Sequence, residues 1–215
     1  MKSTKNLVKC LSPSSDGITA AAVRRNPSFP WDTIWRHTYT SILDNKLQTF
    51  QWRLAHGVLY TGGVKKKRGL GDEICPSREC DVVESCHIFW ECPNFQSIRQ
   101  WVKKFYCKLG GSPLSFNSNL FLYGCSPQTL PKEVHNLLWF IICVSKFNIW
   151  KSRVLHVCEN QFQPATVLLD TIKKEIRFRV EADFLRLSHS KFKATWMRGK
   201  SFVRISNNHL FFDLS

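Results

Sequence analysis

Apolar residues recur every three or four positions along several stretches of the chain, which is the spacing of one face of an α-helix. Over residues 31–60 this spacing predicts a short helix followed by a longer one. It returns over residues 95–109, and then over two long stretches, 132–160 and 164–187. Pro131 stands directly before the first of these, a favourable place for a helix to begin. The chain is therefore predicted to be mainly α.

Glycine-rich and polar stretches separate the predicted helices. Residues 57–71 hold five glycines around a run of four basic residues, so this stretch is predicted to be a loop. Residues 111–131 are predicted to form a linker loop, with a short strand or helix at 120–123. Near the C-terminus two apolar runs flank Asn207 and Asn208, and a β-hairpin is expected there because asparagine tolerates the positive φ of tight turns.

These breaks divide the chain into four predicted parts. A loose leader over residues 1–30 has no sustained apolar periodicity. A first folded unit spans 31–110, and the linker loop over 111–131 joins it to a helical C-terminal region over 132–215 that ends in the hairpin.

The net charge of the chain indicates which class of molecule it binds. The 215 residues include 31 Lys and Arg against 16 Asp and Glu, a net charge of +15. A field of this sign attracts nucleic acid, either RNA or DNA. The chain has no apolar run of the roughly 18 residues that a membrane span needs, and its N-terminus does not resemble a secretory signal. We therefore expect an intracellular protein, nuclear or cytoplasmic, with no membrane partner and no small-molecule substrate.

Three of the four cysteines in residues 75–92, together with one histidine, have the spacing Cys-x4-Cys-x6-His-x4-Cys. Zinc is bound in proteins by four such ligands at tetrahedral corners, and a set of four protein ligands leaves no position for a substrate water. The predicted metal is therefore a structural Zn²⁺, in a small zinc knuckle, and the alternative is a group of free buried cysteines with a core histidine. The predicted ligands are Cys75, Cys80, His87 and Cys92.

Cys86 directly precedes His87 and is an alternative to Cys92 as the fourth ligand. Cys92 is preferred because neighbouring residues rarely reach one metal ion comfortably. A thiol nucleophile at Cys86 with His87 as its base is disfavoured for the same reason of geometry. The other five cysteines are scattered along the sequence and are predicted to be core residues, namely Cys10, Cys107, Cys125, Cys143 and Cys158.

An ordered series of residues surrounds the cysteine/histidine cluster. It consists of Trp31, Ile34, Trp35, Phe50, Trp52, Arg53, residues 56–61, Glu84, Ile88, Phe89 and Trp101. Together with the four predicted ligands, this series resembles the zinc-binding domain that follows the polymerase in LINE-type, non-LTR retrotransposon reverse transcriptases. The resemblance covers about a third of the chain, residues 31–101, and assigns the unit over 31–110 to that domain. The long helices and the tail resemble the carboxy-terminal extension of vertebrate elements.

Two features depart from this family. The first cysteine pair is Cys-x4-Cys where many members have Cys-x2-Cys. The chain also has no Asp-Asp pair, whereas a polymerase needs paired aspartates to hold two metal ions. The resemblance therefore implies a detached piece of a retroelement protein, or a host protein derived from one, that is not itself an enzyme.

The favoured function is a non-catalytic, nucleic-acid-binding zinc module. The alternatives are a protein-interaction scaffold stabilised by a structural zinc and a retroelement remnant without function. Acidic interruptions at Glu175, Glu181 and Asp183 favour a scattered rather than continuous basic face. The predicted nucleic-acid contacts are Lys65, Lys66, Lys67, Arg68, Lys173, Lys174, Arg177, Lys191, Lys193, Arg198, Lys200 and Arg204.

Overall fold

The computed structural model describes residues 28–69, 74–77, 80–84, 86–126, 130–197, 202–207 and 209–214. Within them the chain is mainly α, as the sequence predicts, and a single antiparallel pair of strands lies near the C-terminus. Most of the predicted leader lies outside the described residues. The described part contains no helix that is both long enough and apolar enough to cross a membrane.

The first helices confirm the pattern over residues 31–60. Helix α3 covers Trp31–Thr38, and α4 covers Asn45–Ala55. Asp44 begins α4 as its N-cap, because its side chain accepts a hydrogen bond from the backbone N–H of Leu47 at 2.8 Å. The middle of the chain adds α6 over His87–Trp90 and α7 over Gln96–Lys108, preceded by a 3₁₀ turn at Pro93–Phe95.

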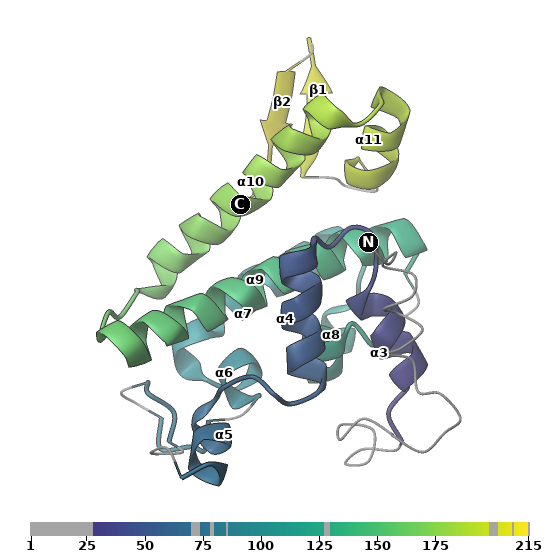
Figure 1. Ribbon diagram of the computed structural model, residues 1–215. Helices are drawn as coiled ribbons and strands as arrows, with labels where there is room; N and C mark the ends of the chain where they lie inside the picture. Colours follow the sequence, from purple (N-terminus) through teal and green to yellow (C-terminus); the bar gives the residue numbers. More distant parts are fainter. Residues whose placement is uncertain are drawn as a thin grey trace, which may run out of the picture.

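The two long predicted helices are also present. Helix α9 spans Lys132–Glu159 and ends where Asn160 takes a left-handed conformation, and α10 spans Ala165–Arg186. In Figure 1, α10 lies above α9, and α4 passes in front of α9 and extends below it. Between Leu137 and Ile149, α9 is buried on almost every face, so it forms the centre of the core.

The C-terminal hairpin is confirmed. Strand β1, Val203–Ser206, pairs with β2, His209–Phe212, in the antiparallel register Val203↔Phe212. Beyond the hairpin, the backbone carbonyl of Leu214 accepts a hydrogen bond from Nε1 of Trp101 on α7 at 3.2 Å. The hairpin therefore packs against the part of the chain that contains the cysteine/histidine cluster, and buried side chains from residues 42–214 form one continuous core.

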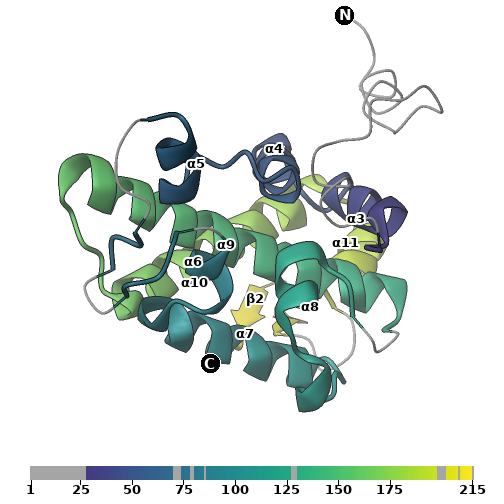
Figure 2. The same cartoon turned by 90° about the horizontal axis from the view of Figure 1, so that it is seen from below.

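Two short helices differ from the sequence expectations, and a third agrees with one of them. The glycine-rich stretch predicted as a loop contains α5, Gly62–Lys67. The short strand or helix expected at 120–123 is a helix, α8, Ser118–Tyr123, with Leu120, Phe121 and Leu122 buried. Helix α11, His189–Trp196, was not predicted and lies between α10 and the hairpin. Figure 2, seen from below, shows α5 and α11 on opposite sides of α4.

The prediction that the scattered cysteines are core residues is right only in part. Cys143 is fully buried in the centre of α9. Cys107 and Cys125 are half-buried, and Cys158 is exposed because it lies in the last turn of α9, after the last buried residue of that helix, Arg153. Cys10 lies outside the described residues.

Candidate metal centre and nucleic-acid interface

The first two cysteines of the cluster are held by a tight turn of backbone. Ile74 and Val83 form an isolated antiparallel bridge, and the N–H of Cys75 donates to the carbonyl of Val82 at 2.9 Å. The N–H of Cys80 then donates to the carbonyl of Ser77 at 3.1 Å. Residues 78–79 lie outside the described part. These bonds hold the backbone on either side of them, and the ligand atoms of Cys75 and Cys80 belong to one cluster.

The other two members come from α6 and the turn after it. His87 is the first residue of α6, and its carbonyl accepts from the N–H of Cys92 at 3.0 Å, so the chain turns back at the end of the helix. The side chains of His87 and Cys92 thereby reach the same point as the cysteine turn. Both residues are buried, at 6% and 0% exposure respectively.

The four predicted ligands come together in the structure. One potential ligand atom from each of Cys75, Cys80, His87 and Cys92 lies within 4.8 Å of all the others, and all four residues are buried. Cys80 Sγ and His87 Nε2 are 2.9 Å apart. Zn–S bonds of about 2.3 Å at tetrahedral angles would separate two sulfurs by about 3.8 Å. The spacing of this quartet therefore fits a four-coordinate metal ion.

Side chains that contact the quartet are also of the kinds found around metal sites. His87 Nδ1 and a carboxylate oxygen of Glu91 are 3.2 Å apart, which leaves Nε2 facing Cys80. A carboxylate on the outer nitrogen is the usual way to orient a metal-binding histidine. Ser77 Oγ lies 3.3 Å from Cys92 Sγ, and Arg99 donates to the carbonyl of Cys92 at 2.9 Å.

Arg99 supplies positive charge beside the sulfurs. Its Nη1 is buried without a hydrogen-bond partner among the described residues. Burial lowers the pKa of Arg99, and the negative charge of a Cys92 thiolate opposes this shift. Three thiolates around one divalent ion leave a net charge of −1, which the Arg99 guanidinium would balance. Glu91 and Arg99 were not among the predicted site residues, although Glu91 lies one helical turn after His87.

The thiols of the quartet titrate differently. The hydrogen bond with Cys92 is the main reason that the pKa of Cys75 falls to about 5, and a hydrogen bond with Ser77 helps against the opposing effect of burial. Burial, together with the charge of Cys75, raises the pKa of Cys80. The hydrogen bond with Cys75 likewise raises the pKa of Cys92. Without a metal ion, the quartet therefore favours one thiolate and disfavours the ionisation of a second thiol. A bound cation is needed to stabilise three thiolates together.

The structure separates the two candidates for the fourth ligand. Cys86 is not a member of the described cluster, and its thiol instead interacts with Tyr123 of α8, while burial raises its pKa. Cys92, the preferred candidate, is the one that belongs to the buried quartet. Among the described residues, Cys86 and His87 therefore have different surroundings, Tyr123 for the thiol and the quartet for the imidazole.

A buried ion pair fixes the cluster to the core. Glu84 accepts hydrogen bonds from Nε and Nη2 of Arg153 on α9, the second at 2.6 Å, and from the backbone N–H of Gly62. The Glu84 and Arg153 side chains are 1% and 5% exposed. The same glutamate therefore connects three parts of the chain, the cysteine/histidine segment, α9 and the start of α5.

The contact with Glu84 also explains why a helix forms where a loop was expected. The N–H of Gly63 donates to the carbonyl of Glu84 at 3.1 Å, and the carbonyl of Thr61 accepts from Val64 and Lys65. A Cβ at Gly63 would approach the Glu84 carbonyl to 3.1 Å, so glycine permits the close approach. The backbone N–H groups that open α5 are thus satisfied from outside the helix.

The predicted nucleic-acid contacts fall into two separate regions. Lys66 and Arg68 are exposed, Lys65 is half-buried, and Arg68 lies 5.7 Å from the ring of Tyr60. The side chain of Lys67 lies outside the described part. Figure 1 places α5 at one end of the molecule and the hairpin at the other, so the first basic region is distant from the second.

Within the second region the basic residues do not all face one way. Lys173 lies over Trp101 of α7 at 5.9 Å, and Arg177 over Phe212 of β2 at 5.7 Å. Lys174, Lys191, Lys193 and Arg204 are exposed. Arg198 and Lys200 lie outside the described residues.

The acidic interruptions have different surroundings. Glu175 pairs with Lys46 at 2.8 Å and Asp183 is almost fully buried, whereas Glu181 is exposed. Two of the three acidic residues thus turn away from the exposed basic side chains, and only Glu181 interrupts them at the surface.

Comparison with known proteins gives one match. No family model matches the chain, and no solved structure matches it. Over 151 residues the chain is 25% identical to the "Transposon TX1 uncharacterized 149 kDa protein" of Xenopus laevis, a match that covers 70% of this chain and 11% of that protein. The chain is therefore similar to one part of a much longer transposon protein, and it combines that similarity with a buried Cys3His quartet able to hold a metal ion.

Proposed function

We propose that this chain is a non-catalytic, zinc-binding and nucleic-acid-binding module derived from a retrotransposon reverse transcriptase protein. The observation that carries the proposal is the buried quartet of Cys75, Cys80, His87 and Cys92. These residues would hold Zn²⁺, which supplies a four-way cross-link and leaves no coordination position for substrate. The similarity to a transposon protein supports the retroelement origin.

The role of the metal would be to position the basic helix α5. The quartet fixes the segment that contains Glu84, and Glu84 contacts the first turn of α5 as well as Arg153. Lys66 and Arg68 are exposed at the end of this short helix. A phosphate backbone would be held there by charge, with Tyr60 beside Arg68 as an exposed ring that an unpaired base can stack on.

Zinc binding is tested by elemental analysis of the purified protein and of Cys80→Ser and His87→Ala variants. We expect one zinc per chain in the parent and less than a tenth of that in either variant. Cys158→Ser is the matched control, because Cys158 is exposed and outside the quartet, and it should retain full metal content. A folded parent without zinc would overturn the proposed metal.

Nucleic-acid binding is tested by titrating labelled RNA and DNA strands at several salt concentrations. Each phosphate contact contributes about −0.7 to the slope of log K against log salt for a single strand. The double variant Lys66→Gln/Arg68→Gln should therefore reduce the steepness by about 1.4. Lys103→Gln/Lys104→Gln removes the same charge from exposed positions on α7 and should change the slope little. Binding that does not respond to salt would contradict the proposal.

A second candidate function, a protein-interaction scaffold, has one specific observation in its favour. Phe178 and Leu185 of α10 are 73% and 87% exposed, two turns apart on the helix. Large exposed apolar side chains are typical of protein contacts when they form a contiguous patch. Salt-insensitive self-association that is lost in Phe178→Ser/Leu185→Ser would favour this function over the first.

A further inference from the structure

A cavity of about 250 Å³ lies among residues of α9, α10 and α11 and the turn after α3. Its walls come from four parts of the chain: the turn at Ser41, the first turns of α9, the C-terminal half of α10, and α11. The volume is below the roughly 300–1,000 Å³ of pockets for drug-sized ligands. A single planar ring system with a few substituents is therefore the size of ligand that it can take.

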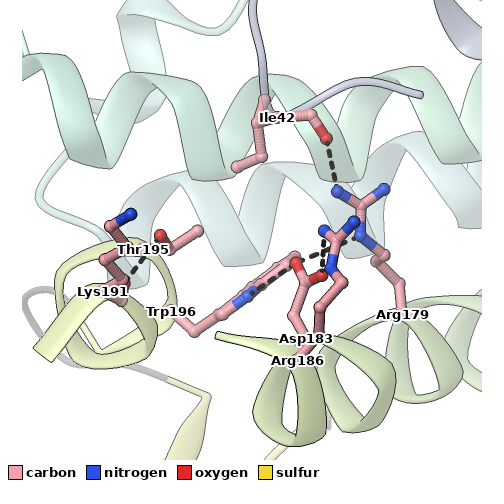
Figure 3. A network of polar contacts seen from close by, with 7 residues as sticks. All are labelled: Ile42, Arg179, Asp183, Arg186, Lys191, Thr195 and Trp196. Carbon is pink, nitrogen blue, oxygen red and sulfur yellow. Dashed lines mark hydrogen bonds and ion pairs between the residues drawn. The ribbon is translucent and has the colours of Figure 1, made fainter. Parts of the chain in front are cut away.

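A buried carboxylate organises the charged wall of this cavity. Asp183 is 4% exposed and accepts hydrogen bonds from Arg179 Nε at 3.1 Å, Arg186 Nη2 at 2.7 Å and Trp196 Nε1 at 3.3 Å. Figure 3 shows both guanidinium groups meeting this carboxylate. Arg179 also donates to the carbonyl of Ile42 at 3.3 Å. This hydrogen bond connects α10, which forms one wall of the cavity, to the turn after α3.

The guanidinium groups of Arg179 and Arg186 are held in place, but some of their N–H groups have no hydrogen-bond partner among the described residues. A guanidinium has five N–H donors. Arg186 uses only Nη2, and its Nε and Nη1 have no hydrogen-bond partner among the residues that the structure describes. Its side chain is 70% exposed, so these donors are accessible from solvent. Such a positioned group is suited to bind a phosphate oxygen or to stack its plane on a base.

The rest of the lining provides what a base requires. The amide of Asn136 and the hydroxyl of Ser41 have no hydrogen-bond partner within the described part of the chain, and an amide can pair with the edge of a base. Leu187 and Ala194 contribute apolar surface. With two arginines against Asp183 and Glu133, the lining is neutral overall, which favours one phosphate over a triphosphate.

We propose that this cavity binds one unpaired nucleotide of a nucleic-acid strand, with its base inside the cavity and its phosphate at Arg186. The inference rests on the proposed function and deepens it, because it predicts a preference for single strands. In a duplex the bases are stacked and paired, so none can enter a cavity of this size without leaving the helix. The chain's net charge of +15 favours a polynucleotide over an acidic peptide as the source of the ligand.

The test uses the full chain and two probes. The first probe is a 12-nucleotide RNA, single-stranded or paired with its complement, in a fluorescence anisotropy titration. Ala194→Leu fills the cavity without changing charge, so we expect at least a fivefold loss of single-strand affinity and less than a twofold change for the duplex. Arg186→Gln should also weaken single-strand binding, whereas Lys104→Gln removes the same charge from an exposed position on α7, outside the cavity lining, and should preserve the preference.

The second probe is a nucleoside monophosphate, measured by calorimetry against inorganic phosphate and against the free nucleoside. We expect the monophosphate to bind most tightly and to lose at least tenfold in affinity in Arg186→Gln. Asn136→Ala gives a second cavity variant if Ala194→Leu fails to fold, as judged by circular dichroism.

The outcomes separate this inference from the function on which it rests. Equal loss of single-strand and duplex affinity in the cavity variants would overturn the inference, and so would phosphate that binds as tightly as the monophosphate. A parent that binds neither RNA form nor the DNA strands used above would overturn the proposed function instead. The monophosphate titration alone would then test whether the cavity binds a nucleotide.

Discussion

Replacing Arg153 by methionine tests whether the Glu84–Arg153 pair holds the cysteine/histidine segment on α9. Methionine keeps most of the side-chain volume of arginine and can still pack against Trp150, whose ring lies 5.0 Å from the guanidinium carbon. The substitution removes two hydrogen bonds to Glu84. Among the described residues, that carboxylate, which is 1% exposed, then keeps only the N–H of Gly62 as a donor.

The expected loss is large for a single substitution. A hydrogen bond to a charged group contributes about 1.5–3 kcal/mol, so two of them amount to about 3–6 kcal/mol. Breaking a buried ion pair by removing one partner costs about 3–5 kcal/mol, because the remaining charge stays buried. We therefore expect Arg153→Met to lower the free energy of unfolding by about 4 kcal/mol, a large part of the roughly 5–15 kcal/mol of a typical domain.

Urea unfolding of the zinc-loaded protein measures this loss, and a double-mutant cycle with Glu84→Gln isolates the pair. The double variant should be no less stable than Arg153→Met alone, since it no longer contains an uncompensated carboxylate. Lys151→Met is the control on the same helix, because Lys151 is 45% exposed and lies 3.8 Å from Glu175. It should cost less than about 1 kcal/mol. A loss below about 1 kcal/mol in Arg153→Met, or additive losses in the cycle, would refute the reasoning.

Three further predictions concern other parts of the molecule. Cys92→Ser should abolish zinc binding in elemental analysis and Cys86→Ser should not, because only Cys92 lies in the quartet. Burial lowers the pKa of Lys146 to about 8, so the folded state binds this proton more weakly than the unfolded state. Unfolding at pH 7 and pH 10 should therefore show the parent gaining about 3 kcal/mol relative to Lys146→Met as the pH rises through 8 toward 10.5; an equal response in both proteins would contradict this. Gly124→Ala should cost about 2 kcal/mol in urea unfolding, because φ is +76° and a Cβ would lie 2.7 Å from His37 Nδ1; an unchanged midpoint would contradict the strain.

The long helices could be predicted from sequence because their burial pattern is local. On α10 the positions Leu168, Ile172, Ile176 and Val180 repeat every four residues, and all four are buried in the structure. The quartet could be predicted for a different reason: few roles besides metal binding require three cysteines and a histidine within so short a stretch, whatever the backbone does between them.

Elements that depend on distant residues could not be predicted in this way. Helix α5 begins with two glycines, which have poor helix propensity, and the hydrogen bonds at its start come from Glu84, about twenty positions later. Cys158 shows the converse error, since it lies on a helix whose centre is buried but in a turn that is exposed. Apolar periodicity identifies the face of a helix, and it does not say how far along the helix that face is covered.

Asp183 shows how burial can reverse the interpretation of a charged residue. In sequence it is an acidic interruption among basic residues, which argues against a binding face. In the structure it lies on the buried side of α10, one turn after Val180, where Trp196 of α11 donates a hydrogen bond to it. A carboxylate in that position needs cationic partners, and the residues one turn before and after it on the same side are Arg179 and Arg186. The acidic residue therefore gathers and orients two arginines instead of cancelling them at the surface, which is why the cavity beside it carries our inference of a nucleotide site.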